Sequence, residues 1–145
     1  MNTPAKANIG LFLARVPLGL YFLIAGYCHV RSGLSGFVDG GMTHLPAWLP
    51  PNVGKPYLYM LPFVEFAVGL FVTVGLLTRF SALVKALILT SILIAMGGID
   101  PGKPFHTNII LLGLALLLAL LGGGEYSIDR IMQRRKSSKP QPAAG

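Results

Sequence analysis

The residues of this chain that could do chemistry are few, and most of them interrupt or flank long apolar runs. Arg15 and Glu65 each stand as the single charge in such a run. His29 and His106 lie near the ends of two runs, and Tyr27 is close to His29. Guanidinium, imidazole and phenol groups donate hydrogen bonds, and a carboxyl group can accept and release a proton. The chemistry predicted for this set is therefore hydrogen bonding to a ligand, with Glu65 as a proton relay.

Three interpretations of Arg15 and Glu65 follow from their depth in the apolar runs. An ionisable residue near the centre of a bilayer costs about 2.5–3.5 kcal/mol on insertion scales. The residue numbers place the two side chains roughly 8 Å apart along the helix axes, so an ion pair between them is the first hypothesis. In the second, Arg15 extends to the headgroups and Glu65 is protonated. In the third, both belong to a functional site without pairing. Lys85, early in its run, is predicted to extend to the headgroups.

Helical spacing puts small residues on the same faces as these charges. Gly19 and Gly26 follow Arg15 at steps of three and four, and Gly69 follows Glu65 four residues later. Small residues at such positions let two helix backbones approach closely in a membrane. Gly19, Gly26 and Gly69 are therefore predicted to be packing positions inside a bundle.

The residue set argues against several cofactors. Two histidines without a third close ligand are a weak metal signal, and the single Cys cannot form an intramolecular disulfide. The histidines and Tyr27 are also explained by contact with headgroups and water. No flavin or dinucleotide glycine motif and no haem-binding pair is visible, so we predict no metal, flavin or haem site.

The elements that must position these residues are membrane-spanning helices. Hydrophobic residues make up 53% of the 145 residues and charged residues 12%, against about 25% charged in soluble domains. Apolar runs at about 9–30, 57–77, 80–98 and 105–121 are long enough to cross about 30 Å of hydrocarbon, the last of them if it is tilted or locally shortened. We predict an all-α, integral membrane four-helix bundle. The net charge of +7 is not gathered on a folded face, which excludes nucleic-acid binding.

The basic residues predict the orientation, because cytoplasmic segments retain Lys and Arg. The larger group falls on the side of both termini, which we therefore expect in the cytoplasm: Lys6, Arg79, Arg130, Arg134, Arg135, Lys136 and Lys139. Residues 31–56, rich in Gly and Pro, are expected outside without a regular element, with Trp48 at the interface. Residues 1–130 form one predicted domain, and residues 131–145 are predicted to be a disordered basic cytoplasmic tail, whose charge is compatible with contact with anionic lipid.

Several short motifs occur in an order that resembles the DoxX family of small four-helix membrane proteins. They span about 110 residues and comprise Ala14-Arg15-Val16 with Gly19 and Ala25-Gly26, then Val64-Glu65-Phe66-Ala67-Val68-Gly69, Gly75-Leu76-Leu77-Thr78-Arg79 and Gly122-Gly123-Gly124-Glu125-Tyr126-Ser127-Ile128-Asp129. The chain departs from the family in having His29 where a Lys is common, Gly123 in place of a Pro, and Phe105-His106-Thr107-Asn108 in place of a Gly-Tyr-Glu.

The resemblance implies a redox-associated membrane subunit. Some relatives are subunits of thiosulfate:quinone oxidoreductase or are linked to quinol oxidation, others associate with thiol-stress proteins, and many have no assigned activity. A quinone is compatible with the polar residues, since its carbonyl oxygens need donors in an apolar pocket. The candidate ligand-binding residues are Arg15, Glu65, His29, His106 and Tyr27. Electrons would come from a partner protein or a substrate, and whether the chain is itself an enzyme stays open.

Two rival functions remain beside this one. The leading rival is a non-catalytic membrane scaffold or assembly subunit, in a larger complex or a homo-oligomer, whose Arg15 and Glu65 faces only pack. A small-solute carrier is third, because the four short helices show no inverted repeat.

Overall fold

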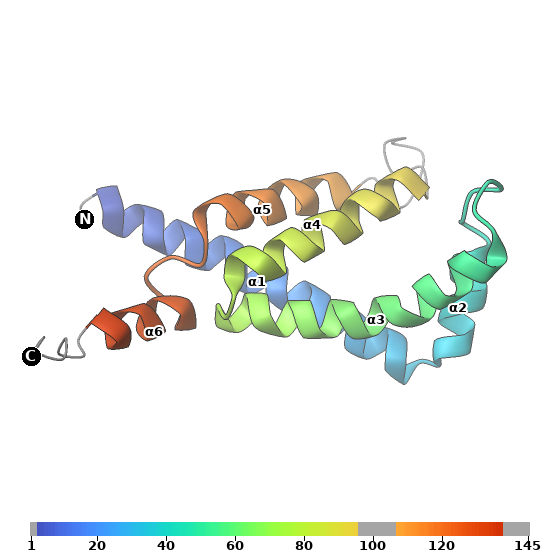
Figure 1. Ribbon diagram of the computed structural model, residues 1–145, viewed down its shortest axis with the longest axis horizontal. Helices are drawn as coiled ribbons and strands as arrows, with labels where there is room; N and C mark the ends of the chain where they lie inside the picture. Colours follow the sequence, from blue (N-terminus) through green and yellow to red (C-terminus); the bar gives the residue numbers. More distant parts are fainter. Residues whose placement is uncertain (1–2, 96–106, 138–145) are drawn as a thin grey trace, which may run out of the picture.

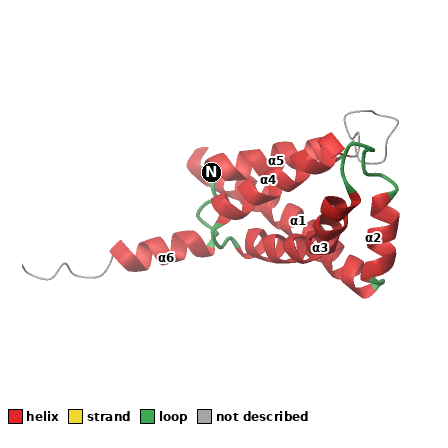
Figure 2. Ribbon diagram, turned by 45° about the vertical axis from the view of Figure 1, so that its right-hand side comes forward, coloured by secondary structure: helices red, strands yellow, loops and turns green. Residues whose placement is uncertain are grey.

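The chain folds into helices joined by short turns, as a computed structural model shows for residues 3–95 and 107–137, the part of the chain that is described (Figures 1 and 2). The helices are α1 (Thr3–Arg31), α2 (Leu34–Met42), α3 (Pro51–Val74), α4 (Thr78–Ala95), α5 (Asn108–Leu121) and α6 (Ile128–Ser137). No strand occurs among the described residues. The predicted all-α class is confirmed.

The helices α1, α3, α4 and α5 run along the long axis of the molecule, whereas the shorter helices α2 and α6 lie toward its two ends (Figure 1). α1 packs along α3, and α4 packs along α5. The beginnings of α1 and α4 lie at the same end as α6, which we call the α6 end, whereas α2 and the beginning of α3 lie at the opposite end, the α2 end (Figure 1). α1 and α4 therefore run in the same direction, and α3 runs against them.

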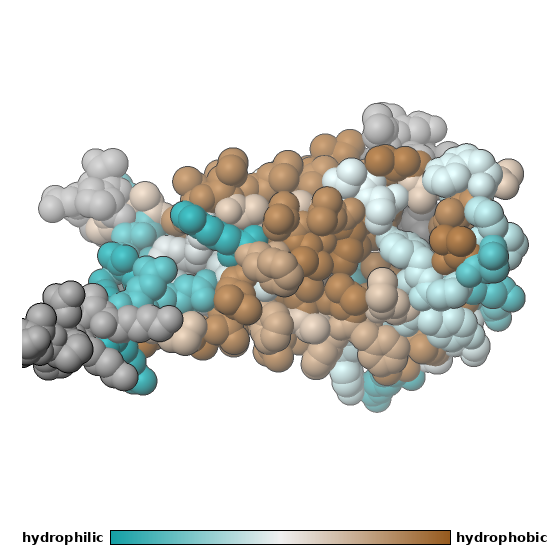
Figure 3. All heavy atoms as spheres, viewed as in Figure 1, coloured by the Kyte–Doolittle hydropathy of each residue, from teal (hydrophilic) through white to brown (hydrophobic). Residues whose placement is uncertain are grey.

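The surface of these helices suits lipid. α1, α3 and α4 are each long and apolar enough to cross a membrane, and α5 is a shorter apolar helix of 14 residues. Large apolar side chains are exposed around the bundle, among them Leu13, Ile24, Ile110 and Leu120. Figure 3 shows apolar surface over the middle of the bundle and hydrophilic surface near the α6 end. These apolar helices and their exposed apolar surface confirm the prediction of an integral membrane protein.

The core lies where α1, α3, α4 and α5 meet. Its buried apolar residues are Leu18, Phe22, Val68, Val72, Ala82, Ala86, Leu89, Ala115 and Leu118. Several of them are small, which brings the helix axes close together. The charged side chains Arg15, Glu65 and Lys85 are buried in the same bundle.

Gly19, Gly26 and Gly69 lie where α1 crosses α3. A Cβ atom added to Gly26 would come within 2.6 Å of the Pro62 carbonyl oxygen, and one added to Gly69 would come within 2.8 Å of the Gly19 carbonyl oxygen. Real Cβ atoms do not approach backbone atoms so closely. The backbones of α1 and α3 therefore touch at positions that only glycine fits.

The structure differs from the sequence-based boundaries at the start of α3. This helix begins at Pro51 and contains Pro56 and Pro62, whereas the prediction began it at residue 57. Pro51 is accommodated because the first helical turn needs no backbone N–H donor. In membrane helices, neighbouring helices and local adjustments also allow proline farther along.

The expectation of no regular element in residues 31–56 is wrong, because α2 forms there. Its residues contain no proline, and Gly33, with φ of 106°, separates it from α1. Val38 is buried, and Gly41 lies against the side chain of Leu58 on α3. Glycine in α2 thus allows close packing on α3.

The predicted disordered tail also differs, since residues 131–137 continue α6. The Ser127 hydroxyl accepts a hydrogen bond from the Arg130 backbone N–H at the start of this helix, which is the geometry of a helix N-cap. Residues 138–145 lie outside the described part of the chain.

Candidate functional site

Glu65 is the centre of a buried polar group on three helices. Its Oε1 atom accepts a hydrogen bond from Lys85 Nζ of α4 at 3.0 Å. Its Oε2 atom lies 3.5 Å from His29 Nδ1 of α1. The side chains of Glu65 and Lys85 are 7% and 1% exposed, whereas that of His29 is 37% exposed. We call these three residues the Glu65 centre; His29 connects it to the surface.

Aromatic rings border the Glu65 centre. The ammonium group of Lys85 lies 3.3 Å from the centroid of the Phe22 ring, where the ring quadrupole attracts a cation. The ring of Phe37, from α2, stacks on the imidazole of His29 with centroids 4.3 Å apart. α2 therefore helps to hold His29 in place.

A cavity of about 400 Å³ opens beside Glu65 and His29. Its wall is mainly apolar and aromatic and comes from all of the helices except α6: Tyr21, Phe22, Ala25, His29, Gly36, Phe37, Gly40, Gly41, His44, Leu58, Leu61, Glu65, Leu89, Ile92 and Asn108. Small-molecule sites are usually apolar cavities of about 300–1,000 Å³ with a few polar groups that fix orientation. Glu65 and His29 are polar groups of this kind.

The predicted ion pair between Arg15 and Glu65 is wrong. Arg15 Nη1 lies against Gly75 and Ser127, at the α6 end, while Glu65 pairs with Lys85. Gly75 and Glu65 are about 15 Å apart along the helix axis at 1.5 Å per residue. The axial offset inferred from the sequence was too small because it set the ends of the two helices level, whereas α1 begins at Thr3 and extends past the end of α3, which brings Arg15 beside Gly75.

The prediction that Lys85 extends to the headgroups is also wrong, since its side chain is 1% exposed and bonded to Glu65. Thr78, Ser81 and Lys85 are spaced at i, i+3 and i+7 and share one buried face of α4. This spacing is the sequence signal that could have placed Lys85 in the interior.

The remaining candidate residues do not join the Glu65 centre. Tyr27 is 53% exposed, and its neighbour Cys28 is also exposed. His106 lies outside the described residues. Of the four candidate ligand-binding residues that the structure describes, it thus brings together Glu65 and His29 and leaves Arg15 and Tyr27 elsewhere. Within residues 3–95 and 107–137, no group of three or more His, Cys, Asp or Glu side chains could hold a metal ion.

Arg15 belongs to a second polar group at the α6 end. Its Nη2 atom donates a hydrogen bond to the Tyr126 carbonyl oxygen at 2.9 Å. Asp129 accepts the backbone N–H groups of Leu77 and Thr78 at 2.7 and 2.8 Å, and its own N–H donates to the Gly75 carbonyl oxygen at 3.0 Å. Asp129 thereby caps the start of α4 from the start of α6.

We call Arg15, Gly75, Thr78, Ser127 and Asp129 the Arg15 cluster. It fastens the chain after α5 to the turn between α3 and α4. Gly75 is in the left-handed conformation, with φ of 74°, and ends α3. A side chain at Gly75 would collide with the Arg15 guanidinium group, so glycine is needed for both reasons.

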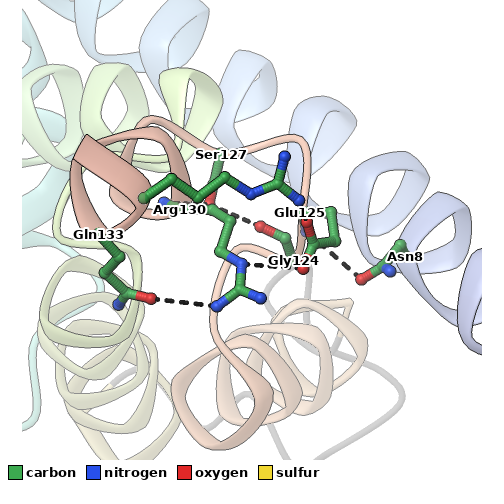
Figure 4. A network of polar contacts seen from close by, with 7 residues as sticks. Asn8, Gly124, Glu125, Ser127, Arg130 and Gln133 are labelled. Carbon is green, nitrogen blue, oxygen red and sulfur yellow. Dashed lines mark hydrogen bonds and ion pairs between the residues drawn. The ribbon is translucent and has the colours of Figure 1, made fainter. Parts of the chain in front are cut away.

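Polar contacts continue outward from the Arg15 cluster, as Figure 4 shows. The Glu125 carboxylate forms ion pairs with Arg130, at 2.8 Å, and with Arg134. The Glu125 backbone N–H donates to the Asn8 side chain at 3.3 Å. A second cavity of about 690 Å³ opens beside them, and its lining includes Asn8, Thr78, Arg79, Glu125 and Arg130.

Comparison with known proteins agrees with this architecture. Residues 46–142 match the family model described as "TQO small subunit DoxD". The chain is 31% identical over 133 residues to inner membrane protein YqjF of Escherichia coli strain K12, covering 88% of this chain and 95% of that protein. This chain belongs to the DoxX/DoxD family of membrane proteins. No solved structure matches it.

The sequence motifs shared with the family are divided between the two polar groups. The motifs around Arg15, Gly75 and Asp129 that carry the DoxX resemblance meet in the Arg15 cluster. The Val64–Gly69 motif instead supplies Glu65 to the cavity at the α2 end. The family motifs thus include one structural junction and one residue beside a cavity.

Proposed function

We propose that this DoxX/DoxD-family chain is a membrane subunit of a redox complex and binds a quinone in the cavity beside the Glu65 centre. The observation that carries the proposal is the joint presence of an apolar, aromatic wall and the Glu65–His29 pair in a cavity of about 400 Å³. A quinone ring suits such a wall, and a quinone carbonyl oxygen needs a hydrogen-bond donor. His29 would donate to the ligand, and Glu65 would hold a proton.

The residues of the Glu65 centre have distinct roles in this proposal. A bound quinone supplies a carrier for two electrons and two protons. Lys85 holds Glu65 from the side away from the cavity, while His29 links Glu65 to the surface. Electrons would come from a protein partner, in agreement with the words "small subunit" in the family description. Arg15 is not part of this proposed site, because it lies at the α6 end.

The proposed topology has four spans and cytoplasmic termini. α5 would form the fourth span; its 14 residues cover about 21 Å, and it packs along α4. The basic residues Lys6, Arg79, Arg130, Arg134 and Arg135 come from the start of α1, the start of α4 and α6, all at the α6 end. An excess of Lys and Arg favours the cytoplasmic side, which supports a cavity near the outer face in the proposed topology.

Cavity-filling substitutions test the quinone site. Gly40 lines the cavity, and nothing lies within 4 Å of a Cβ atom added there. Gly40→Phe should therefore fit without a clash yet fill the cavity. We expect the affinity for decylubiquinone, measured by titration calorimetry on purified protein in detergent, to fall at least tenfold. Gly113→Phe is the matched control, since Gly113 is equally open and does not line the cavity.

A scaffold function is the second candidate, and the Glu65–Lys85 contact favours it. The two charges neutralise each other inside the bundle, which explains their presence without a ligand. If decylubiquinone does not bind to wild-type protein, or binds equally well to Gly40→Phe, the quinone proposal fails and the scaffold explains the site better.

A further inference from the structure

Buried polar atoms without a hydrogen-bond partner gather along one line through the bundle. Among the described residues they are Arg15 Nε and Nη1, Thr78 Oγ1 and Ser81 Oγ, whereas Glu65 Oε2 and His29 Nδ1, the other two buried atoms without a hydrogen bond, face each other at 3.5 Å. Arg15, Thr78 and Ser81 are at most 1% exposed. Leaving a buried polar group unpaired costs about 1–3 kcal/mol, so buried polar groups normally bond to protein or to ordered water.

The line follows one face of α4. Thr78, Ser81 and Lys85 share this face, and helical geometry separates them by about 4.5 Å and about 6 Å along the axis. Lys85 then contacts Glu65 at 3.0 Å, and Glu65 faces His29 at 3.5 Å. Polar groups thus succeed one another from the start of α4 to the cavity at the α2 end.

The facing helix α1 has the same register. α1 and α4 run in the same direction (Figure 1), and Phe22 of α1 lies against Lys85 of α4. Arg15 precedes Phe22 by seven residues, and Thr78 precedes Lys85 by seven residues. Arg15 and Thr78 therefore lie at a similar position along the helix axes. The contact of Arg15 Nη1 with Gly75, three residues before Thr78, agrees with this position.

We infer that this line is a hydrated polar pathway that carries protons between the α6 end and Glu65. Water bridges unpaired polar groups that are too far apart for direct hydrogen bonds, and the spacing along α4 suits one or two waters at each step. The hydroxyl groups of Thr78 and Ser81 can both donate and accept, as proton transfer along such a chain requires. The proton moves between water and the Glu65 carboxylate; no electron transfer is involved.

The surrounding charges are compatible with this route. Arg15 and Lys85 face the pathway from α1 and α4, while Glu65 and Asp129 face it from α3 and α6. The Lys85–Glu65 contact lies between the pathway and His29, which borders the cavity at the α2 end. The inference does not depend on quinone binding, so the two proposals can fail separately.

Silver-ion access to single cysteines tests the hydration. On a Cys28→Ser background, Ser81→Cys is compared with Ala82→Cys, whose position on the same helix is 0% exposed but off the polar line. Protein in chloride-free membrane vesicles of both orientations is exposed to Ag⁺, then unfolded and labelled with a maleimide. We expect Ag⁺ to protect Ser81→Cys at least tenfold faster than Ala82→Cys, and faster from the α6 side.

Equal protection rates at the two positions would overturn the hydrated pathway. Faster protection of Ser81→Cys from the α2 side would overturn its entry at the α6 end. If Ala82→Cys does not fold, Ala86→Cys serves as the buried control, because Ala86 is 3% exposed on the same helix.

Proton flux into proteoliposomes tests the transport role. Under a potassium diffusion potential, an internal pH dye should report at least threefold slower flux for the Thr78→Val, Ser81→Ala double variant than for wild type. Thr90→Val is the control, since the Thr90 hydroxyl is bonded to the Ala86 carbonyl oxygen within α4 and is off the line. Wild-type flux equal to that of protein-free liposomes, or unchanged flux in the double variant, would overturn the proton route.

Discussion

The Glu65 centre and the Arg15 cluster bury charge in the same bundle but satisfy it differently. Glu65 is held by the side chains of Lys85 and His29 beside a cavity. Arg15 is held by a backbone carbonyl oxygen, with Asp129 nearby but bonded to the backbone at the start of α4. Side-chain pairs can rearrange around a ligand, whereas contacts to backbone fix where segments meet. The difference indicates a site at one end and a structural junction at the other.

The largest expected effect concerns the pairing of Glu65. Removing one partner of a buried ion pair costs about 3–5 kcal/mol, while replacing both with apolar residues is often nearly neutral. We therefore expect Glu65→Leu and Lys85→Leu each to lower thermal stability in detergent strongly, and the double variant to recover most of the loss. Circular dichroism of the purified proteins measures this.

The Arg15→Leu, Glu65→Leu double variant is the comparison for that experiment. These residues belong to separate groups, so their losses should add within about 0.5 kcal/mol. Recovery in this double variant, rather than in the one with Lys85, would contradict the assignment of partners.

Close packing between α1 and α3 should have the next largest effect, because it sets the spacing on which both polar groups depend. A Cβ atom at Gly69 would overlap the α1 backbone, whereas nothing lies within 4 Å of one at Gly113. Overpacking costs about 1–3 kcal/mol, and alanine otherwise favours a helix by about 0.5–1 kcal/mol over glycine. Gly69→Ala should lower the melting temperature and Gly113→Ala should leave it unchanged or raise it; equal effects would contradict the backbone contact.

The sequence predicted the class of fold and the two charged side chains Arg15 and Glu65 inside the bundle, but it predicted neither the burial of Lys85 nor which charges pair. Apolar run lengths gave the all-helical membrane class, and the spacing of Gly19, Gly26 and Gly69 with the charges placed these glycines at helix crossings. Pairing depends on the axial offset between helices. The sequence did not show that α1 extends past the end of α3, so the offset between Arg15 and Glu65 was underestimated and the two charges were assigned to each other.

The Glu65 centre also required contacts that no local pattern contains. Lys85 near a helix start resembles a residue that extends to headgroups, and its burial depends on how α4 faces α1 and α3. The glycines of α2 suggested a loop, although they allow α2 to pack on α3 and border the cavity. In both cases tertiary packing overrode the local signal.

A smaller effect is expected at the junction formed by Asp129. Loss of a helix cap costs about 0.5–2 kcal/mol, so Asp129→Ala should lower stability by that amount. Asp129→Asn keeps one side-chain carbonyl oxygen, which can accept one of the two backbone hydrogen bonds, and should recover part of the loss. The exposed residue Asp39 provides the control, since Asp39→Ala removes the same charge away from the junction. Asp129→Ala should leave the affinity for decylubiquinone unchanged. If its binding free energy falls by an amount similar to the loss of unfolding free energy, the Arg15 cluster and the Glu65 centre are not independent, contrary to the proposal.

The smallest effect should come from the ion pairs of Glu125. Its partners Arg130 and Arg134 have side chains 46% and 68% exposed, and exposed pairs contribute about 0–1 kcal/mol because water and salt screen them. Glu125→Gln should therefore change the melting temperature little, and the change should shrink further as salt rises from low to physiological concentration. The backbone N–H of residue 125 keeps its bond to Asn8, so the chain there retains its anchor. A loss as large as that of Asp129→Ala, persisting at high salt, would show that surface charge holds the α6 end together and that the Arg15 cluster is not its junction.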